Sequence, residues 1–219
     1  MTLIRKNLRP GLKTERILFF SDAVFAIAIT ILVLAISLPV LSSAQVSKGL
    51  LLKNLIELWP KFISFFISFI VIGIFWMGHV IMFNFIKRSD RNLLWLNNLL
   101  LLFVSFIPFP AALIGEYNQD KYAIILYGVT LMMLGFIYLI LWLYASHNFR
   151  LIDKDLPKNI IRKATYAVLV APVSYLIAIL FAFINPLITL IMYAIIPILY
   201  IIPSPIDEFV DYIFQSNDD

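Results

Sequence analysis

Long runs of apolar residues, separated by short polar stretches, set the pattern along this chain of 219 residues. A helix that crosses a membrane needs about 20 mostly apolar residues, and six runs reach that length. They cover residues 16–39, 61–86, 93–114, 122–146, 163–184 and 187–206. A transmembrane barrel would instead need short segments of alternating polarity. The pattern therefore predicts an all-α, polytopic membrane protein with six transmembrane helices.

The composition supports this class and excludes several functions. Charged residues make up 14% of the chain, against about 25% in a soluble domain. Outside a transmembrane domain of residues 16–206, only a short N-terminal tail (1–15) and an acidic C-terminal tail (207–219) remain. The chain has no cysteine, which rules out disulfides and thiolate metal sites. The runs contain no pair of carboxylates or His–Glu spacing of metal-site type. We expect no enzymatic activity, no cofactor and no nucleic-acid partner.

The distribution of lysine and arginine predicts the orientation in the membrane. Most of the 17 basic residues lie in the N-terminal tail and in the loops that follow the second and fourth runs. Because basic loops stay on the cytoplasmic side, we expect both termini to be cytoplasmic. The chain is then a multi-pass protein of the cell membrane, or of the inner membrane in a bacterium.

The connections between the runs carry further signals. Residues 46–58 fit either a short amphipathic helix on the outer surface or an ordinary loop. Asn185 and Pro186 leave room for only a tight turn, so the last two helices should form an antiparallel hairpin. Proline interrupts helical hydrogen bonding, and we expect the sixth helix to be kinked or broken at its prolines, which are Pro197, Pro203 and Pro205.

Several polar residues occur where a membrane span should be apolar. At about 1.5 Å per residue from the nearest basic residues, they share one layer in the inner half of the bilayer. The layer contains Ser21, Asp22, His79, Asn97 and Asn98. Trp76 offers an indole N–H at nearly the same level, and Arg16 either folds onto the layer or extends to the headgroups. Unpaired polar groups in hydrocarbon are costly. The layer is therefore either an interhelical clamp, which we favour, or a proton relay or ion site.

The first helix has a second face of a different kind. At 100° per residue, four branched aliphatic residues fall on one stripe, which points about 140° away from Asp22. The stripe consists of Ile27, Ile31, Leu34 and Leu38, and the Thr30 hydroxyl borders it. Periodicity alone leaves two partners for this stripe: lipid, which it favours, or a symmetry axis where copies of the helix meet.

Short motifs in the first three runs resemble a known family. The first run has Arg16-x-x-x-Phe20-Ser21-Asp22 and then Ala23 to Thr30, the second has Trp76-x-x-His79, and the third has Asn98 and Pro108. Together they resemble the transmembrane protein 175 potassium channel family in its single-repeat prokaryotic form. The resemblance extends over nearly the whole chain but is specific only in the first three helices.

The resemblance implies a homotetrameric, potassium-selective but leaky cation channel whose central pore is lined by the first helix of each copy. It implies a constriction at Ile27, further apolar layers at Ile31 and Leu34, and a hydroxyl at Thr30. Potassium ions would pass near Ile27 and Thr30 without a fixed metal site, and the apolar ring would act as gate.

The resemblance also implies that the polar layer stabilises the pore helix. Its members would be Arg16, Ser21, Asp22, Trp76, His79 and Asn98. One alternative remains: a proton-conducting channel or a proton-coupled secondary transporter, in which Asp22 and His79 titrate.

Overall fold

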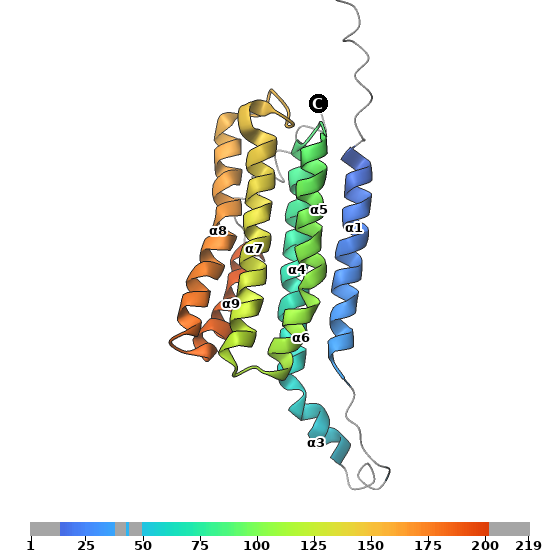
Figure 1. Cartoon of the computed structure of the whole chain (residues 1–219), viewed down its shortest axis with the longest axis vertical. Coiled ribbons are helices and arrows are strands. Elements are labelled where there is room, and N and C mark those ends of the chain that lie inside the picture. The colour runs from blue at the N-terminus through green and yellow to red at the C-terminus, as the bar shows by residue number, and fades with distance from the viewer. Residues whose placement is uncertain (1–13, 38–42, 44–49, 202–219) are drawn as a thin grey trace, which may run out of the picture.

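The computed structural model describes residues 14–37, 43 and 50–201, and these form a bundle of helices whose axes run roughly along one direction (Figure 1). Its helices are α1 (Thr14–Ile31), α3 (Leu50–Glu57), α4 (Trp59–Phe85), α5 (Arg91–Phe106), α6 (Pro108–Glu116), α7 (Lys121–Ser146), α8 (Lys158–Ala182) and α9 (Pro186–Ile201). Two 3₁₀ turns, η1 (Leu32–Ala35) and η2 (His147–Phe149), extend α1 and α7. The predicted all-α class is confirmed.

Five helical stretches of the described chain are long and apolar enough to cross a membrane. They are Thr14–Ala35, Trp59–Phe85, Arg91–Glu116, Lys121–Phe149 and Lys158–Ala182. The described part of the sixth run forms α9, whose 16 residues are fewer than the about 20 of a usual span; residues 202–206 of this run lie outside the described residues. The structure therefore supports five long apolar helices and one shorter helix.

The third apolar run is divided into two helices rather than one. α5 ends at Phe106, and α6 begins at Pro108 in its first turn. Proline has no N–H to donate, so the Val104 carbonyl accepts instead from the Ile107 N–H, at 3.3 Å. The span continues beyond this break to Glu116.

The connections between helices agree with most of the sequence signals. Of the two interpretations of residues 46–58, the helix is confirmed as α3, which buries none of its residues. α8 and α9 form the expected hairpin, and the Asn185 side chain accepts a hydrogen bond from the Leu187 N–H at the start of α9. α9 continues through Pro197. Leu38, Pro203, Pro205 and most residues of the two predicted tails lie outside the described residues.

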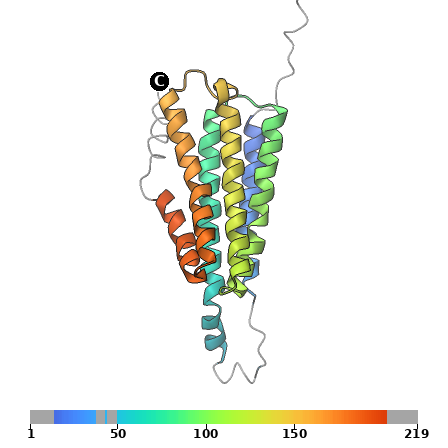
Figure 2. The same cartoon turned by 60° about the vertical axis from the view of Figure 1, so that its left-hand side comes forward.

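The helices are arranged so that α1 lies at one edge of the bundle. It contacts α4, α5 and α6, while α7 packs against α5, α6, α8 and α9. In the turned view, α8 and α9 lie at the side opposite α1 (Figure 2). Of the five spans, α7 is the most buried and α1 is among the least.

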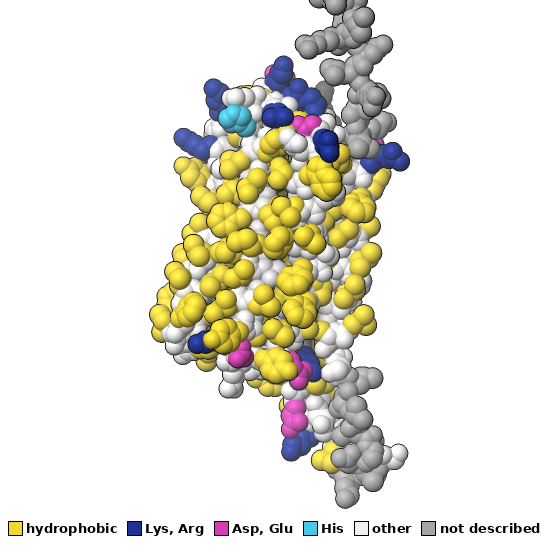
Figure 3. All heavy atoms as spheres, in the orientation of Figure 1, with side chains coloured by type: hydrophobic (Ala, Val, Ile, Leu, Met, Phe, Trp, Pro, Cys, Tyr) yellow, Lys and Arg dark blue, Asp and Glu magenta, His cyan; other side chains and the backbone are white. Residues whose placement is uncertain are grey.

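Charged side chains gather at the two ends of the bundle. Figure 3 shows a hydrophobic middle and most of the visible lysines and arginines at the end where α1 begins. The α4–α5 and α7–α8 loops also lie at this end (Figure 1), which we call the basic end.

Candidate functional site

Three buried polar side chains from different helices form a continuous chain of hydrogen bonds. His79 of α4 bonds through Nε2 to Asn97 Oδ1 of α5, at 2.8 Å. Asn97 Nδ2 donates to Ser21 Oγ of α1, at 3.0 Å. Ser21 Oγ donates to the Ile17 carbonyl, at 2.8 Å. All three side chains are almost completely buried. We call this set the polar clamp, because it joins α1, α4 and α5.

The direction of these hydrogen bonds is fixed from one end to the other. The Asn97 amide nitrogen donates to Ser21, so its carbonyl oxygen must accept, and His79 must carry its proton on Nε2. His79 Nδ1 is buried and has no hydrogen-bond partner among the described residues. The imidazole ring stacks on Phe83 at a centroid distance of 4.4 Å and lies beside Phe25. The clamp therefore places the imidazole ring in an aromatic setting.

A separate hydrogen bond connects α1 and α4 close to the clamp. The Trp76 indole N–H donates to Asp22 Oδ1, at 2.8 Å. A bond from a neutral donor to a carboxylate is stronger than one between neutral groups. Asp22 is thus directed toward α4 of its own chain. Arg16 is exposed near the start of α1 and is not one of the residues that form the clamp.

The structure selects one of two adjacent asparagines. Asn97 is buried in the clamp, whereas Asn98 is exposed on the single chain. One residue along a helix corresponds to a rotation of about 100°, so both side chains cannot face α1 and α4. The resemblance had assigned Asn98 to the polar layer. In this structure the role belongs to Asn97, which the depth argument had placed in the layer together with Asn98.

The two faces of α1 are in different environments. The face toward α4 and α5 is buried along its length, with Ile17, Ser21, Phe25, Ala28 and Leu32. The opposite face is open: Ile27 is 57% exposed and Leu34 is 76% exposed, and Ile31 is also exposed. The predicted aliphatic stripe therefore has no partner within the described chain.

The Thr30 side chain lies on the open face. Its hydroxyl donates to the Ile27 carbonyl, at 2.9 Å. This bond uses the single hydroxyl proton and leaves the oxygen lone pairs free to face whatever lies along the stripe. The residue can thus offer an oxygen, and no donor, to a neighbouring ion or molecule.

A lysine that the sequence analysis did not select holds the far end of α1. Lys61 of α4 donates to the Ser37 hydroxyl, at 3.0 Å, and pairs with Glu116 at the end of α6, at 2.6 Å. Its side chain is mostly buried. Nothing in the sequence indicates this contact, because Ser37 and Lys61 are brought together only by the packing of α1 on α4.

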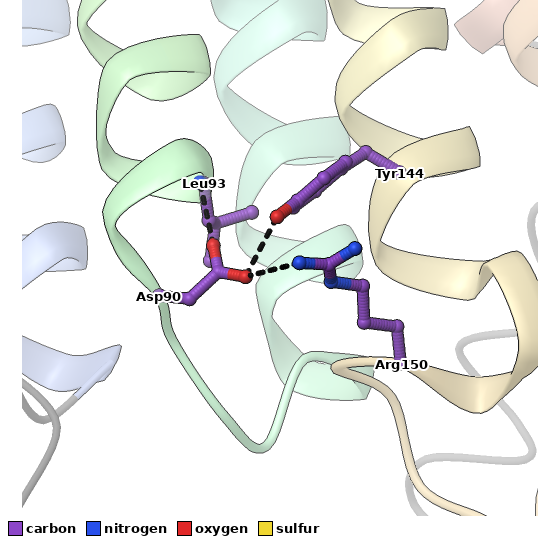
Figure 4. A network of polar contacts seen from close by, with 4 residues as sticks. All are labelled: Asp90, Leu93, Tyr144 and Arg150. Carbon is purple, nitrogen blue, oxygen red and sulfur yellow. Dashed lines mark hydrogen bonds and ion pairs between the residues drawn. The ribbon is translucent and has the colours of Figure 1, made fainter.

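A second polar cluster joins two loops at the basic end (Figure 4). Asp90 caps α5 by accepting from the Leu93 N–H, at 2.9 Å. Its other oxygen accepts from the Tyr144 hydroxyl, at 2.7 Å, and pairs with Arg150, at 3.3 Å. We call this set the basic-end latch. An Asp directly before a helix is a usual cap, so the cap could have been found from the sequence, but its two distant partners could not.

The pKa of the Asp90 carboxyl reflects this setting. Partial burial raises the pKa, but the hydrogen bonds from Tyr144 and Leu93 and the nearby Arg150 charge outweigh it, so the pKa is lowered below its usual value. The carboxylate form is therefore the one that the latch stabilises.

Fold and site together define a polytopic membrane protein whose polar side chains connect helices, and whose edge helix presents an unpaired aliphatic stripe. In the described part of the chain, no three His, Cys, Asp or Glu side chains gather as they would around a metal ion. A bundle of apolar helices joined by buried polar contacts, with an open aliphatic face on its edge helix, is typical of ion channels and transporters.

Comparison with known proteins identifies the family. The model of the family described as "Endosomal/lysosomal potassium channel TMEM175" matches residues 16–108. A potassium channel of Chamaesiphon minutus is 35% identical over 176 residues, which cover 79% of this chain and 86% of that protein. A potassium channel of Streptomyces collinus is 30% identical over 192 residues, which cover 86% of this chain and 91% of that protein. The chain belongs to the TMEM175 family, a family of ion channels.

A solved structure supports the same assignment. The crystal structure of a lysosomal potassium-selective channel TMEM175 homolog from Chamaesiphon minutus aligns with a TM-score of 0.76 at 32% identity. The alignment covers 85% of this chain and 95% of that chain. The helical arrangement described above is therefore that of the family.

Proposed function

We propose that this chain forms a homotetrameric, potassium-selective cation channel in the cell membrane. In this proposal all six helices are membrane-spanning, both termini are cytoplasmic, and α1 of each copy lines the pore. Ile27 forms the constriction, Ile31 and Leu34 form further apolar layers, and Thr30 contributes an oxygen between them. Potassium is the conducted ion, as the names of the two bacterial relatives suggest.

The observation that carries the proposal is the contrast between the two faces of α1. The buried face and the polar clamp fix the rotation of the helix, so the open stripe cannot turn inward against its own chain. An edge helix of this kind is able to face an axis shared with other copies. Lipid could cover the same stripe, but the bacterial relatives that match most of the chain are potassium channels, which favours the axis.

The apolar constriction supplies a physical mechanism for gating. A narrow hydrophobic passage empties of water and blocks ions, and slight widening lets it fill again. At the constriction an ion must lose part of its hydration shell, and this costs less for potassium than for the more strongly hydrated sodium. The Thr30 oxygen, whose proton is held by the Ile27 carbonyl, replaces some of the lost water.

The alternative, proton conduction or proton-coupled transport through Asp22 and His79, has weaker support. A proton relay needs groups that both accept and release protons along a connected path. The clamp passes through the Asn97 amide and ends on a backbone carbonyl, and neither of these relays protons readily. Within the described part of the chain, His79 Nδ1 has no hydrogen-bond partner that could take or deliver a proton. This geometry favours a structural clamp.

The assignment of the pore can be tested with one pair of variants. Purified protein is reconstituted in potassium-loaded liposomes, with sodium as the comparison ion and a proton-sensitive dye to follow proton flux. Ile27→Asn places an amide at the constriction, and we expect faster flux with reduced preference for potassium. Leu102→Asn is the matched control, because Leu102 of α5 is 59% exposed and Ile27 is 57% exposed.

The outcomes separate the two functions. Unchanged flux and ion preference in Ile27→Asn, with the control also unchanged, would remove Ile27 from the conduction path. Saturable flux of potassium coupled to protons, without unitary current steps in bilayer recordings, would favour the transporter. Asp22→Ala, which removes the acceptor of the Trp76 N–H, is expected to reduce assembly and yield more than ion preference. Normal assembly with altered ion preference would contradict a structural role for the bond between Asp22 and Trp76.

A further inference from the structure

A large apolar cavity lies away from α1, on the other side of α4. It is bordered by α4, α7, α8 and the last turn of α9, and its volume is about 300 Å³. This lies at the lower end of the range for small-molecule sites. From α9 the wall receives Pro197, Tyr200 and Ile201, and Ile201 is the last described residue of the chain.

The shape of the cavity suits an elongated apolar ligand. Along α4 its lining extends from Val71 to Phe85, a distance of roughly 20 Å at about 1.5 Å per residue. That is similar to the roughly 15 Å hydrocarbon depth of one leaflet. Along α8 the wall is made of small side chains, among them Ala164, Ala167 and Ala171. Small residues on the wall leave the space that a chain of methylene groups would fill.

The cavity is lined mainly by apolar side chains, and basic residues lie next to its lining at the basic end of the bundle. Phe85, which borders the cavity, is the last residue of α4 and is followed closely by Lys87. On α8, Lys163 directly precedes Ala164 and lies one helical turn before Ala167, on the same side of the helix. The lining of the cavity thus ends close to basic residues, at the level where the surface of the bundle changes from hydrophobic to basic. Figure 3 shows this change of surface character.

We propose that this cavity is a binding site for one anionic phospholipid of the cytoplasmic leaflet. One acyl chain occupies the cavity between α4, α7, α8 and α9, and the phosphate group lies against Lys163, with Lys87 on the opposite rim. Basic groups at the ends of membrane helices attract anionic headgroups, and the apolar wall excludes the alternative of a free phosphate ion. The site is independent of the conduction path on α1.

Native mass spectrometry of the purified protein tests the proposal. Phosphatidylglycerol and phosphatidylcholine with identical acyl chains are added in equal amounts, and retained lipids are counted per chain. We expect one phosphatidylglycerol per chain, retained about fivefold more strongly than phosphatidylcholine for each basic contact. Equal retention of the two lipids by the unmodified protein would overturn the proposal without any variant.

Two pairs of variants locate the site. Ala167→Trp fills the cavity and should abolish retention, whereas Val170→Trp, at a 46% exposed position that does not border the cavity, should not. Lys163→Gln should reduce phosphatidylglycerol retention to the level of phosphatidylcholine, whereas Arg162→Gln, about 100° around the helix, should have a smaller effect. Unchanged retention in a folded Ala167→Trp, or equal effects of the two glutamine variants, would contradict the assignment.

The competing occupant is the chain itself, since residues 202–219 follow Ile201 at the cavity wall. If these residues occupy the cavity, the full chain retains no lipid and a chain that ends at Ile201 gains one, and the proposal is wrong. None of these lipid counts depends on ion conduction, so they remain informative whether or not the proposed pore is correct.

Discussion

The two halves of the bundle are held together by different chemistry. In the half formed by α1, α4 and α5, polar side chains bond to one another through Ser21, Asn97 and His79. In the half formed by α7, α8 and α9, one side-chain pair joins α7 and α8, where Trp142 donates to the Thr165 hydroxyl at 3.0 Å, and buried hydroxyls bond to backbone carbonyls of neighbouring helices. Tyr193 donates to the Ile124 carbonyl at 3.0 Å, and Thr189 donates to the Ala178 carbonyl at 3.1 Å.

This difference explains why the polar contacts of the first half can be predicted from the sequence and those of the second half cannot. A histidine or an aspartate inside an apolar run is rare and points to a specific partner. Tyrosine, threonine and glycine are common in membrane helices, where small residues and hydroxyls allow close packing. This second half nevertheless contains α7, the most buried of the five spans.

The largest effect is expected at a glycine in the second half. A methyl group at Gly128 of α7 would collide with the buried Tyr193 hydroxyl and come within 2.7 Å of Ile179. Overpacking of this kind costs about 1–3 kcal/mol, and Gly128→Ala should lie near the upper value in an SDS unfolding titration. Gly73→Ala is the control, since nothing lies within 4 Å of the added carbon. It should be neutral or stabilise by up to about 1 kcal/mol.

Breaking the polar clamp should have the next largest effect. Asn97→Leu leaves the buried His79 N–H without an acceptor, which costs about 1–3 kcal/mol. Asn98→Leu, one residue on and exposed, should change stability by no more than about 0.5 kcal/mol. The same unfolding titration applies. Equal losses in the two variants would show that Asn98 has a partner in the assembled protein and that the clamp is larger than the single chain indicates.

A smaller effect is expected from one hydroxyl of the second half. Tyr193→Phe removes the hydrogen bond to Ile124 but keeps the ring, and hydrogen bonds between membrane helices contribute about 0.5–1.5 kcal/mol. Tyr122→Phe is the control, because Tyr122 is exposed at the start of α7. Thermal unfolding in detergent should rank Tyr193→Phe between its control and Asn97→Leu. A loss larger than that of Asn97→Leu would reverse the comparison between the two halves.

The smallest effect concerns the basic-end latch, which joins the two halves. Asn caps a helix as well as Asp does, so Asp90→Asn removes mainly the charge that pairs with Arg150 and accepts from Tyr144. A partly exposed ion pair contributes up to about 1 kcal/mol.

The pH dependence of this variant follows from the lowered pKa of Asp90. A carboxyl with a lowered pKa in the folded state contributes its stabilisation fully above its unfolded pKa of about 4. This contribution is lost as the pH falls through the folded value. The difference in free energy of unfolding between the unmodified protein and Asp90→Asn should therefore be constant from about pH 5 to 8 and shrink below about pH 4. Unfolding titrations of both proteins across this pH range measure it. A difference that changes near neutral pH would point to another titrating group.

The sequence predicted the helices better than it predicted their contacts. Five of the six runs appear as long apolar helices close to the predicted ranges, and the outer segment is helical. Within the polar layer, Ser21, His79 and the Asp22–Trp76 pair could be anticipated from depth alone. The choice of Asn97 over Asn98, the Lys61 contact with Ser37, and the partners of Asp90 could not, because they depend on how separate helices are rotated and placed.

The number, order and apolar character of the spans were determined by the sequence itself. The transfer of each side chain into hydrocarbon has a free energy that depends on that residue and its near neighbours, so the sum over about 20 residues can be read directly. Only the tertiary structure decided which face of α1 is buried, which asparagine completes the clamp, and where α4, α7, α8 and α9 leave a cavity between them. These features depend on the positions of residues far apart in the sequence. Adding the transfer free energies of neighbouring residues therefore cannot predict them.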